Sequence, residues 1–334
     1  MREILVGLLT LLVIACAAGS AFAAADAASA PMLWRNSGAF TAPAGLPRAR
    51  GAEIPEPGRT RFALGVEVAS QFTQDTEGAE DAIIDVETTT TLLSLEHGFA
   101  DIWSASIEIP FVSHDGGFLD ELIDDYHDAL GLPDGGRKSR PRDEILVRWQ
   151  DARGVRRALT DGAAEFGDIR IGFARALVRE ADRTTAIRLG LELPTGNVDA
   201  LTGNDGIDVS LAWHLTDRRL LEGWGWTLHT ALGVLAQVDR DQLYDGDGEN
   251  FVGFGNLTLA WPLGDRWVLK GQLDAHSATA DTRLRQVGGW SVGATLGLAV
   301  RVTDTLVFEG GFAEDLPPGS APDIAFLFAL RGAL

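Results

Sequence analysis

Three residues near the middle of this sequence could hold a divalent cation. Asp120, Asp124 and His127 stand at i, i+4 and i+7 in GGFLDELIDDYHDALGLPDGGR, so they share one face if the segment is helical. Carboxylate oxygens and imidazole nitrogens are common ligands of divalent metals. The same residues also fit the solvated acidic face of a short amphipathic helix, and we favour that interpretation.

The apolar residues of the same segment predict the helix. Leu119, Leu122, Ile123, Tyr126 and Leu130 recur at helical spacing, and Gly131 followed by Pro133 ends the pattern. We expect a helix over 117–130 within a long connection, 113–166. Its apolar face could tuck into the mouth of a barrel as a plug, whose polar residues would be Asp120, Asp124, Tyr126, His127 and Arg137.

A second acidic segment, DRDQLYDGDGEN at 239–250, lacks the spacing and the flanking helices of an EF-hand. We interpret it as a solvated loop that could bind divalent cations loosely, for example against lipopolysaccharide. No Ser-His-Asp set is visible by spacing, so we expect no catalytic residues and no cofactor.

Ionisable residues also recur in the remaining segments, at every second position. In WVLKGQLDAH at 267–276, apolar or small residues alternate with polar ones, which predicts a strand with two unlike faces. Opposed rows of arginine and carboxylate on such polar faces could select solutes by charge. The residues that we expect to line a lumen are Arg170, Arg188, Glu192, Asp208, His229, Lys270, Asp274 and Arg301.

The strands that carry these residues have the length and the pattern of membrane strands. Alternating segments of about 9–15 residues suit a tilted strand that crosses a bilayer. Almost no charge falls on the apolar register, as hydrocarbon contact requires. We therefore expect an all-β, transmembrane antiparallel up-and-down barrel with one short loop helix. The alternative is a soluble sandwich or calyx with its apolar face inward.

The connections alternate between short and long, as outer-membrane barrels require. With both termini on the periplasmic side, this pattern predicts twelve strands over 60–334. The segments 142–150 and 153–160 form a further hairpin, but Arg157 would share a face with Val155 and Leu159. We place this hairpin outside the membrane; fourteen strands are the alternative. The tryptophans beside the short connections predict an aromatic girdle: Trp103, Trp213, Trp224, Trp261 and Trp267.

The N-terminus predicts export. Arg2 precedes an apolar run that is too short to span a bilayer, and Ala21-Phe22-Ala23 fits a cleavage site, so residues 1–23 read as a signal peptide. Lipidation at Cys16, the single cysteine, is the alternative. Residues 24–59 are expected to form a periplasmic segment. The net charge of −20 argues against a nucleic-acid partner.

Three stretches carry a resemblance to known families. GGFLDELIDDYHDALGLPDGGR resembles the GGxxD…H…GLPxGGR signature of an uncharacterised family of bacterial outer-membrane β-barrels, a domain of unknown function. GDIRIGFARAL at 167–177 and LELPTGNVDALTGNDGIDVSL at 191–211 resemble segments of barrel proteins associated with phenol degradation. The resemblance spans about 60–330 and implies a bacterial outer-membrane barrel without assigning a catalytic role.

Together these patterns predict a passive channel or carrier for a small solute. The partners would be outer-membrane lipid, lipopolysaccharide and the solute. A closed barrel that serves as a scaffold or assembly partner is the alternative. An outer-membrane lipid-modifying enzyme is the second alternative, against which His229 and Ser210 fall on the polar, inward register.

Overall fold

The computed structural model describes residues 27–121, 123, 125, 140–238, 241–316 and 321–334. The predicted signal peptide and Cys16 lie outside the described residues. So do Asp124, Tyr126, His127 and Arg137 of the predicted loop helix.

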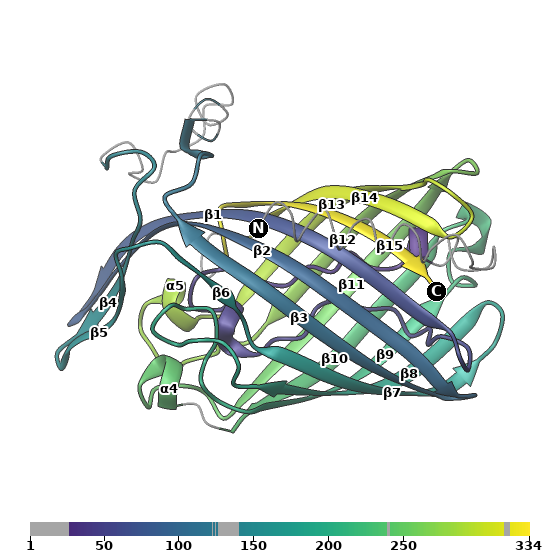
Figure 1. Ribbon diagram of the computed structural model, residues 1–334, viewed down its shortest axis with the longest axis horizontal. Coiled ribbons are helices and arrows are strands. Elements are labelled where there is room, and N and C mark those ends of the chain that lie inside the picture. The colour runs from purple at the N-terminus through teal and green to yellow at the C-terminus, as the bar shows by residue number, and fades with distance from the viewer. Residues whose placement is uncertain (1–26, 122, 124, 126–139, 239–240, 317–320) are drawn as a thin grey trace.

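Twelve antiparallel strands close into a barrel (Figure 1). The ring closes because β1 pairs with both β2 and β15, and β3 pairs with both β2 and β7. This confirms the predicted up-and-down barrel of twelve strands. Its strands are β1 (Thr60–Glu77), β2 (Glu80–Ala100), β3 (Trp103–Asp115), β7 (Ile169–Arg179), β8 (Arg183–Leu193), β9 (Asp208–Asp217), β10 (Thr227–Gln237), β11 (Phe251–Leu263), β12 (Trp267–His276), β13 (Ser291–Arg301), β14 (Leu306–Asp315) and β15 (Ile324–Ala333).

Large apolar side chains cover the outer face of the barrel. Every strand from β7 to β15 exposes one near its middle, which is the arrangement that contact with lipid tails requires. These residues are Phe173, Leu189, Leu211, Leu232, Leu257, Leu273, Leu296, Phe308 and Phe328. The barrel is therefore of the outer-membrane type. No helix among the described residues is long and apolar enough to cross a bilayer.

The two ends of the barrel differ as predicted. Short turns join the strands at the end that carries Leu334, whereas longer connections with α4 (Asp241–Tyr244) and α5 (Arg285–Gly288) lie at the other end (Figure 1). The five predicted girdle tryptophans are exposed, and they lie toward the short turns. Trp226 joins them, with ring centroids 5.3 Å from Trp224 and 5.5 Å from Trp261. We assign the end with short turns to the periplasm.

The extra hairpin lies outside the barrel wall, as predicted. β4 (Leu146–Asp151) pairs with β5 (Gly154–Leu159) and with the overhanging end of β2, and it continues the sheet beyond the ring (Figure 1). β6 (Ala163–Phe166) pairs likewise with the far end of β3. Arg156 and Arg153 on this hairpin bind carboxylates of the acidic 241–250 loop, Asp245 and Asp247 respectively.

The orientation can be tested by labelling single cysteines, since the only native cysteine is in the predicted leader. Val155 on β5 is 61% exposed and Leu220 in a short turn is 69% exposed. On intact cells, Val155→Cys should react with a membrane-impermeant maleimide. Leu220→Cys, the matched control, should react only after the outer membrane is broken. The reverse pattern would invert the assignment of the two ends.

Candidate functional site

The lumen of the barrel is occupied by the chain's own N-terminal segment. Residues 27–54, which we call the luminal hairpin, enter beside the short turns, run to the opposite end and return to start β1 (Figure 1). The turn includes a short 3-10 helix, η2 (Ala42–Ala44), followed by Gly45 with φ of +83°. We predicted a periplasmic segment over 24–59, whereas residues 27–54 lie inside the barrel, held by inward side chains of the wall.

The ascending limb is bonded to β12 and β15 through its main chain. Gln272 on β12 accepts from the Met32 amide at 2.9 Å and donates to the Met32 carbonyl at 3.1 Å. Lys270 donates to the Ala30 carbonyl at 2.7 Å, and Arg331 on β15 donates to the Pro31 carbonyl at 2.7 Å. These wall side chains replace the strand partners that an irregular segment lacks.

The turn of the hairpin is fixed near the extracellular end. The Tyr244 hydroxyl on α4 donates to the Phe40 carbonyl at 2.9 Å, and the Phe40 ring packs edge-on against Trp149, at 6.2 Å between centroids. Gln71 on β1 accepts from the Ala39 amide at 2.9 Å. Thus the β4–β5 hairpin and α4 hold the tip of the luminal hairpin at the extracellular end of the barrel.

The descending limb is bonded to the opposite side of the wall. Arg188 on β8 donates to the carbonyls of Gly51 and Glu53, each at 3.1 Å. Thr216 on β9 accepts from the Ala52 amide at 3.0 Å and donates to Glu53 at 2.7 Å. Arg170 donates to the Gly45 carbonyl. Both limbs therefore use wall arginines as donors to main-chain oxygens.

Among the described residues, Arg50 makes the shortest ion pair between the hairpin and the wall. Its guanidinium lies 2.6 Å from Glu108 on β3, 2.7 Å from the Ser94 hydroxyl and 3.6 Å from Glu96 on β2. Arg48 lies 3.6 Å from the other oxygen of Glu108. Wall carboxylates and hairpin arginines thus form one network of ion pairs inside the barrel.

Most of the residues that we predicted to line the lumen do face it. Arg170, Glu192, Asp208, His229 and Lys270 are buried inside the barrel, where Arg170 pairs with Glu192 at 2.5 Å and Lys270 with Glu309 at 2.7 Å. The strand register places Glu108, Arg170, Glu192 and Asp208 side by side across four neighbouring strands. Their role toward a solute stays a prediction.

The other three predicted residues contact the luminal hairpin, a neighbouring side chain on the same strand, or the rim of the barrel. Arg188 binds the hairpin and Glu96, and Asp274 accepts a hydrogen bond from Gln272 at 2.8 Å. Arg301 lies at the short-turn rim and donates to the Asp265 carbonyl at 2.9 Å. Sequence reasoning missed Glu96, Glu108, Glu309 and Arg331, although each falls on the polar register of its strand.

The predicted plug helix in the third connection lies partly outside the described residues, and its role as a plug stays a prediction. In the described part of helix 117–130, the amides of Phe118 and Leu119 donate to Glu87, at 3.1 and 3.0 Å, at the far end of β2. Asp120 accepts from the Asp143 amide at 3.0 Å. Among the described residues, the element that fills the lumen is the luminal hairpin.

Metal binding at the two acidic segments is not supported by the described residues. Among them, no group of three or more His, Cys, Asp or Glu side chains could hold a metal ion. Asp245 and Asp247 in the acidic loop are bound by arginines of β5 and of the turn before it. The set Asp120, Asp124 and His127 lies partly outside the described residues and stays a prediction.

The loop after β8 is organised by one buried carboxylate. Asp168 accepts from the amides of Thr195, Gly196 and Asn204, at 2.9, 2.7 and 2.9 Å. Burial, and next the nearby Glu192 carboxylate, raise the pKa of Asp168 to about 6. A Cβ at Gly203 would lie 2.6 Å from Asp168, which explains the glycine there. The LPTG and GNDG stretches thus build a loop at the extracellular end.

Glycines in the strands make room for the luminal hairpin. A Cβ at Gly293 on β13 would overlap the Trp34 ring, and a Cβ at Gly297 would overlap Met32. A Cβ at Gly311 on β14 would lie 2.6 Å from the Met32 methyl. These glycines therefore let the Met32 and Trp34 side chains of the ascending limb pack directly against the wall.

A larger side chain at one of these glycines should displace the ascending limb. We expect Gly293→Leu to destabilise the closed state, with the hairpin in the lumen, by roughly 1–3 kcal/mol, which is the usual cost of overpacking. It should raise solute flux in proteoliposomes while the barrel stays folded in gels. Gly271→Leu is the matched control, because a Cβ at Gly271 on β12 would meet nothing within 4 Å. Equal solute flux through both variants would contradict the claim that the ascending limb packs against Gly293.

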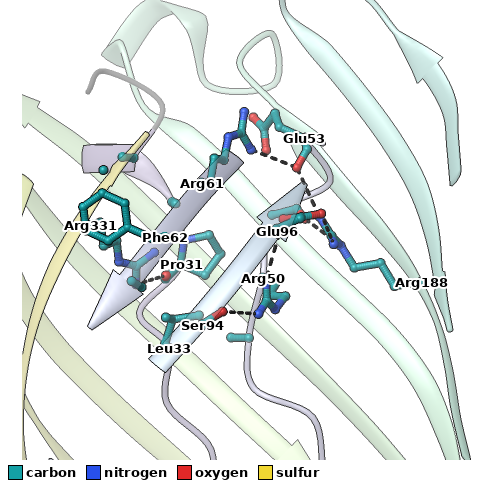
Figure 2. Close-up of a pocket in the computed structure, with 16 residues that line it drawn as sticks. Pro31, Leu33, Arg50, Glu53, Arg61, Phe62, Ser94, Glu96, Arg188 and Arg331 are labelled. Atoms are coloured by element: carbon teal, nitrogen blue, oxygen red, sulfur yellow. Dashed lines mark hydrogen bonds and ion pairs between the residues drawn. The ribbon is translucent and has the colours of Figure 1, made fainter. Parts of the chain in front are cut away.

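Little space remains beside the hairpin. A cavity of about 90 Å³ lies between its two limbs and β1, β2 and β15, and Figure 2 shows Arg50, Ser94, Glu96 and Arg188 along it. A second cavity, of about 50 Å³, lies between the descending limb and the wall from β3 to β11. Both are smaller than the ~150 Å³ that admits benzene. In this conformation each of the two cavities has room for only a few water molecules.

The fold is similar to that of solved outer-membrane proteins. An outer-membrane channel from Pseudomonas putida F1 matches with a TM-score of 0.56 and 11% identity, over 85% of this chain and 98% of that one. The NanC porin matches with a TM-score of 0.49 and 10% identity, over 82% and 100%. At these identities the likeness concerns the fold alone. No curated protein matches the chain.

A family model described as "Protein of unknown function (DUF3187)" matches residues 7–333. The resemblance to an uncharacterised family is thus confirmed at that level. The signature over 116–137 stays a prediction, since it lies partly outside the described residues.

Proposed function

For this chain, which belongs to the DUF3187 family, we propose a gated outer-membrane channel for small solutes, closed by the luminal hairpin. The observation that carries the proposal is how the hairpin is held. Wall side chains donate to its main-chain carbonyls, and water could replace each of these bonds. The donors are Gln272, Lys270, Arg331 and Arg188. A wall built only as a scaffold would be expected to pack its core with apolar side chains instead.

The path of the hairpin sets the direction of opening. Both of its limbs end at the periplasmic side, where the descending limb continues into β1 and Pro57 forms a β-bridge with Gly98 on β2. A segment fixed in this way can withdraw only toward the periplasm. The open barrel would then present the polar wall, with Arg170, Glu192 and Asp208, to a passing solute.

A closed structural barrel is the second candidate. It is favoured by the small volume of the cavities beside the hairpin and by the apolar contacts that Met32 and Trp34 make with Ala69, Ala313 and Leu327. The lipid-modifying enzyme finds less support, because His229 and Ser210 are buried inside the barrel, away from lipid.

Proteoliposome swelling distinguishes the two candidates. The full-length protein should give slow swelling with small neutral solutes such as glycerol, and little with disaccharides. Gly293→Leu should admit both, because it displaces the ascending limb. If this variant is folded by heat-modifiable gel mobility and still excludes glycerol, the channel is refuted and the structural barrel is favoured.

A further inference from the structure

We infer that the site occupied by Arg50 is the selectivity site of the open channel, and that it takes small cations with a guanidinium or primary ammonium group. This inference rests on the proposed function, because it assigns the solute class of that channel. The occupant seen in the structure is a guanidinium carried by the luminal hairpin itself.

The site is built by side chains of two adjacent wall strands. Ser94 and Glu96 stand on β2 and Glu108 on β3, and the register places Ser94 directly opposite Glu108. The Arg50 guanidinium donates to the Ser94 hydroxyl at 2.7 Å and to one Glu108 oxygen at 2.6 Å. Several donors thus meet fixed acceptors, which is the geometry of specific guanidinium recognition.

Glu108 depends on the hairpin for its counter-charge. Two other inward carboxylates have a cation on the wall: Glu192 has Arg170 at 2.5 Å, and Glu309 has Lys270 at 2.7 Å. Among the described residues, the cations within 4 Å of Glu108 are Arg48 and Arg50, and both belong to the hairpin. When the hairpin leaves, Glu108 loses both of the cations that lie within 4 Å of it.

The surroundings of the site leave an approach for a solute. Arg50 borders both the cavity of about 90 Å³ and the cavity of about 50 Å³, and Glu108 borders the second (Figure 2 shows the first). Arg50 therefore stands between two small cavities along the descending limb, and Glu108 lines one of them. A cation that enters as the hairpin withdraws would replace Arg50 in the same contacts, so solute and hairpin compete for one site.

The test uses the barrel lacking residues 27–54 in planar bilayers, with methylguanidinium as the probe and N-methylurea as its uncharged analogue. We expect permeability to favour K⁺ over Cl⁻, and methylguanidinium to block the K⁺ current while N-methylurea does not. Glu108→Gln should lower methylguanidinium affinity about tenfold or more, since a charge-assisted contact contributes about 1.5–3 kcal/mol. Glu180→Gln is the control and should keep the block, because Glu180 lies exposed in a short turn outside the lumen.

The outcomes separate the two claims. A folded barrel without conductance would refute the proposed channel. A conducting barrel that prefers Cl⁻, or whose block is unaffected by Glu108→Gln, would refute the cation site and leave the channel intact. Should the deletion variant fail to fold, full-length Arg50→Ala replaces it. Methylguanidinium should restore its closure and N-methylurea should not, and equal effects of the two probes would overturn the inference.

Discussion

Removing residues 27–54 should convert a protein of low conductance into an open pore. A minor conformational state is commonly populated at about 0.1–10%, so permanent opening should raise the mean conductance by roughly 10- to 1,000-fold. The physical reason is that the hairpin fills the lumen so closely that cavities of about 90 and 50 Å³ remain beside it. The measurement is single-channel recording of both proteins at equal protein density.

The deletion also needs a control for folding. The closed ring of twelve strands is paired without the hairpin, so the variant should keep its heat-modifiable gel mobility. A deletion of the β4–β5 hairpin, residues 146–159, is the control for removing a segment that lies outside the barrel wall. That control should raise the conductance less than the deletion of 27–54 does. It removes only the contact of Trp149 with Phe40 at the tip of the luminal hairpin, and the hairpin itself stays in the lumen. Equal conductance of full-length protein and a folded Δ27–54 variant would contradict gating.

The second large effect should come from the ion pair between Arg50 and Glu108. Arg50→Ala leaves the buried Glu108 without its closest cation, and one hydrogen bond to a charged group contributes about 1.5–3 kcal/mol. The open-to-closed ratio should therefore rise about tenfold or more. Arg219→Ala is the control: its partners Glu180 and Asp182 are about half exposed in a periplasmic turn, where ion pairs contribute little.

A double-mutant cycle shows whether the pair itself is responsible. Arg50→Ala and Glu108→Gln should each favour opening, whereas the double variant should open less than the sum of the two predicts. We expect a coupling energy of at least about 1.5 kcal/mol, which is typical of close charge pairs. Additive effects would show that Arg50 acts through packing and not through Glu108.

The barrel could be predicted because hydrocarbon imposes a strict pattern. The pattern shows which face of β12 contacts lipid. Its outer register holds Leu269 and Leu273, and its inner register holds Lys270 and Gln272. Arg157 placed β5 outside the membrane by the same rule. Side-chain direction alternates along a strand, so residues such as Arg170, Glu192 and Lys270 followed once the register was known.

The luminal hairpin could not be predicted in the same way. Its sequence, AASAPMLWRNSGAFTAPAGLPRARGAEI, has neither a helical nor a strand period, and its shape is set by the cavity around it. A signal was nevertheless present. Gly293, Gly297 and Gly311 fall where inward side chains were expected, and space left by the wall implies another occupant. Arg48 and Arg50 likewise supply the cations that Glu108 lacks on the wall.

The central claim, that residues 27–54 lie inside the barrel with their tip at the extracellular end, can be tested by one crosslink. A Cβ at Gly45 would lie 3.1 Å from the Asp208 Cβ, and disulfides join Cβ atoms about 3.5–4.5 Å apart, so a small shift suffices. The double variant Gly45→Cys, Asp208→Cys should form a disulfide in isolated outer membranes and lose its residual conductance until reductant is added. If no disulfide forms, and the thiol introduced by Gly45→Cys is instead labelled by maleimide from the periplasmic side, the hairpin does not occupy the lumen.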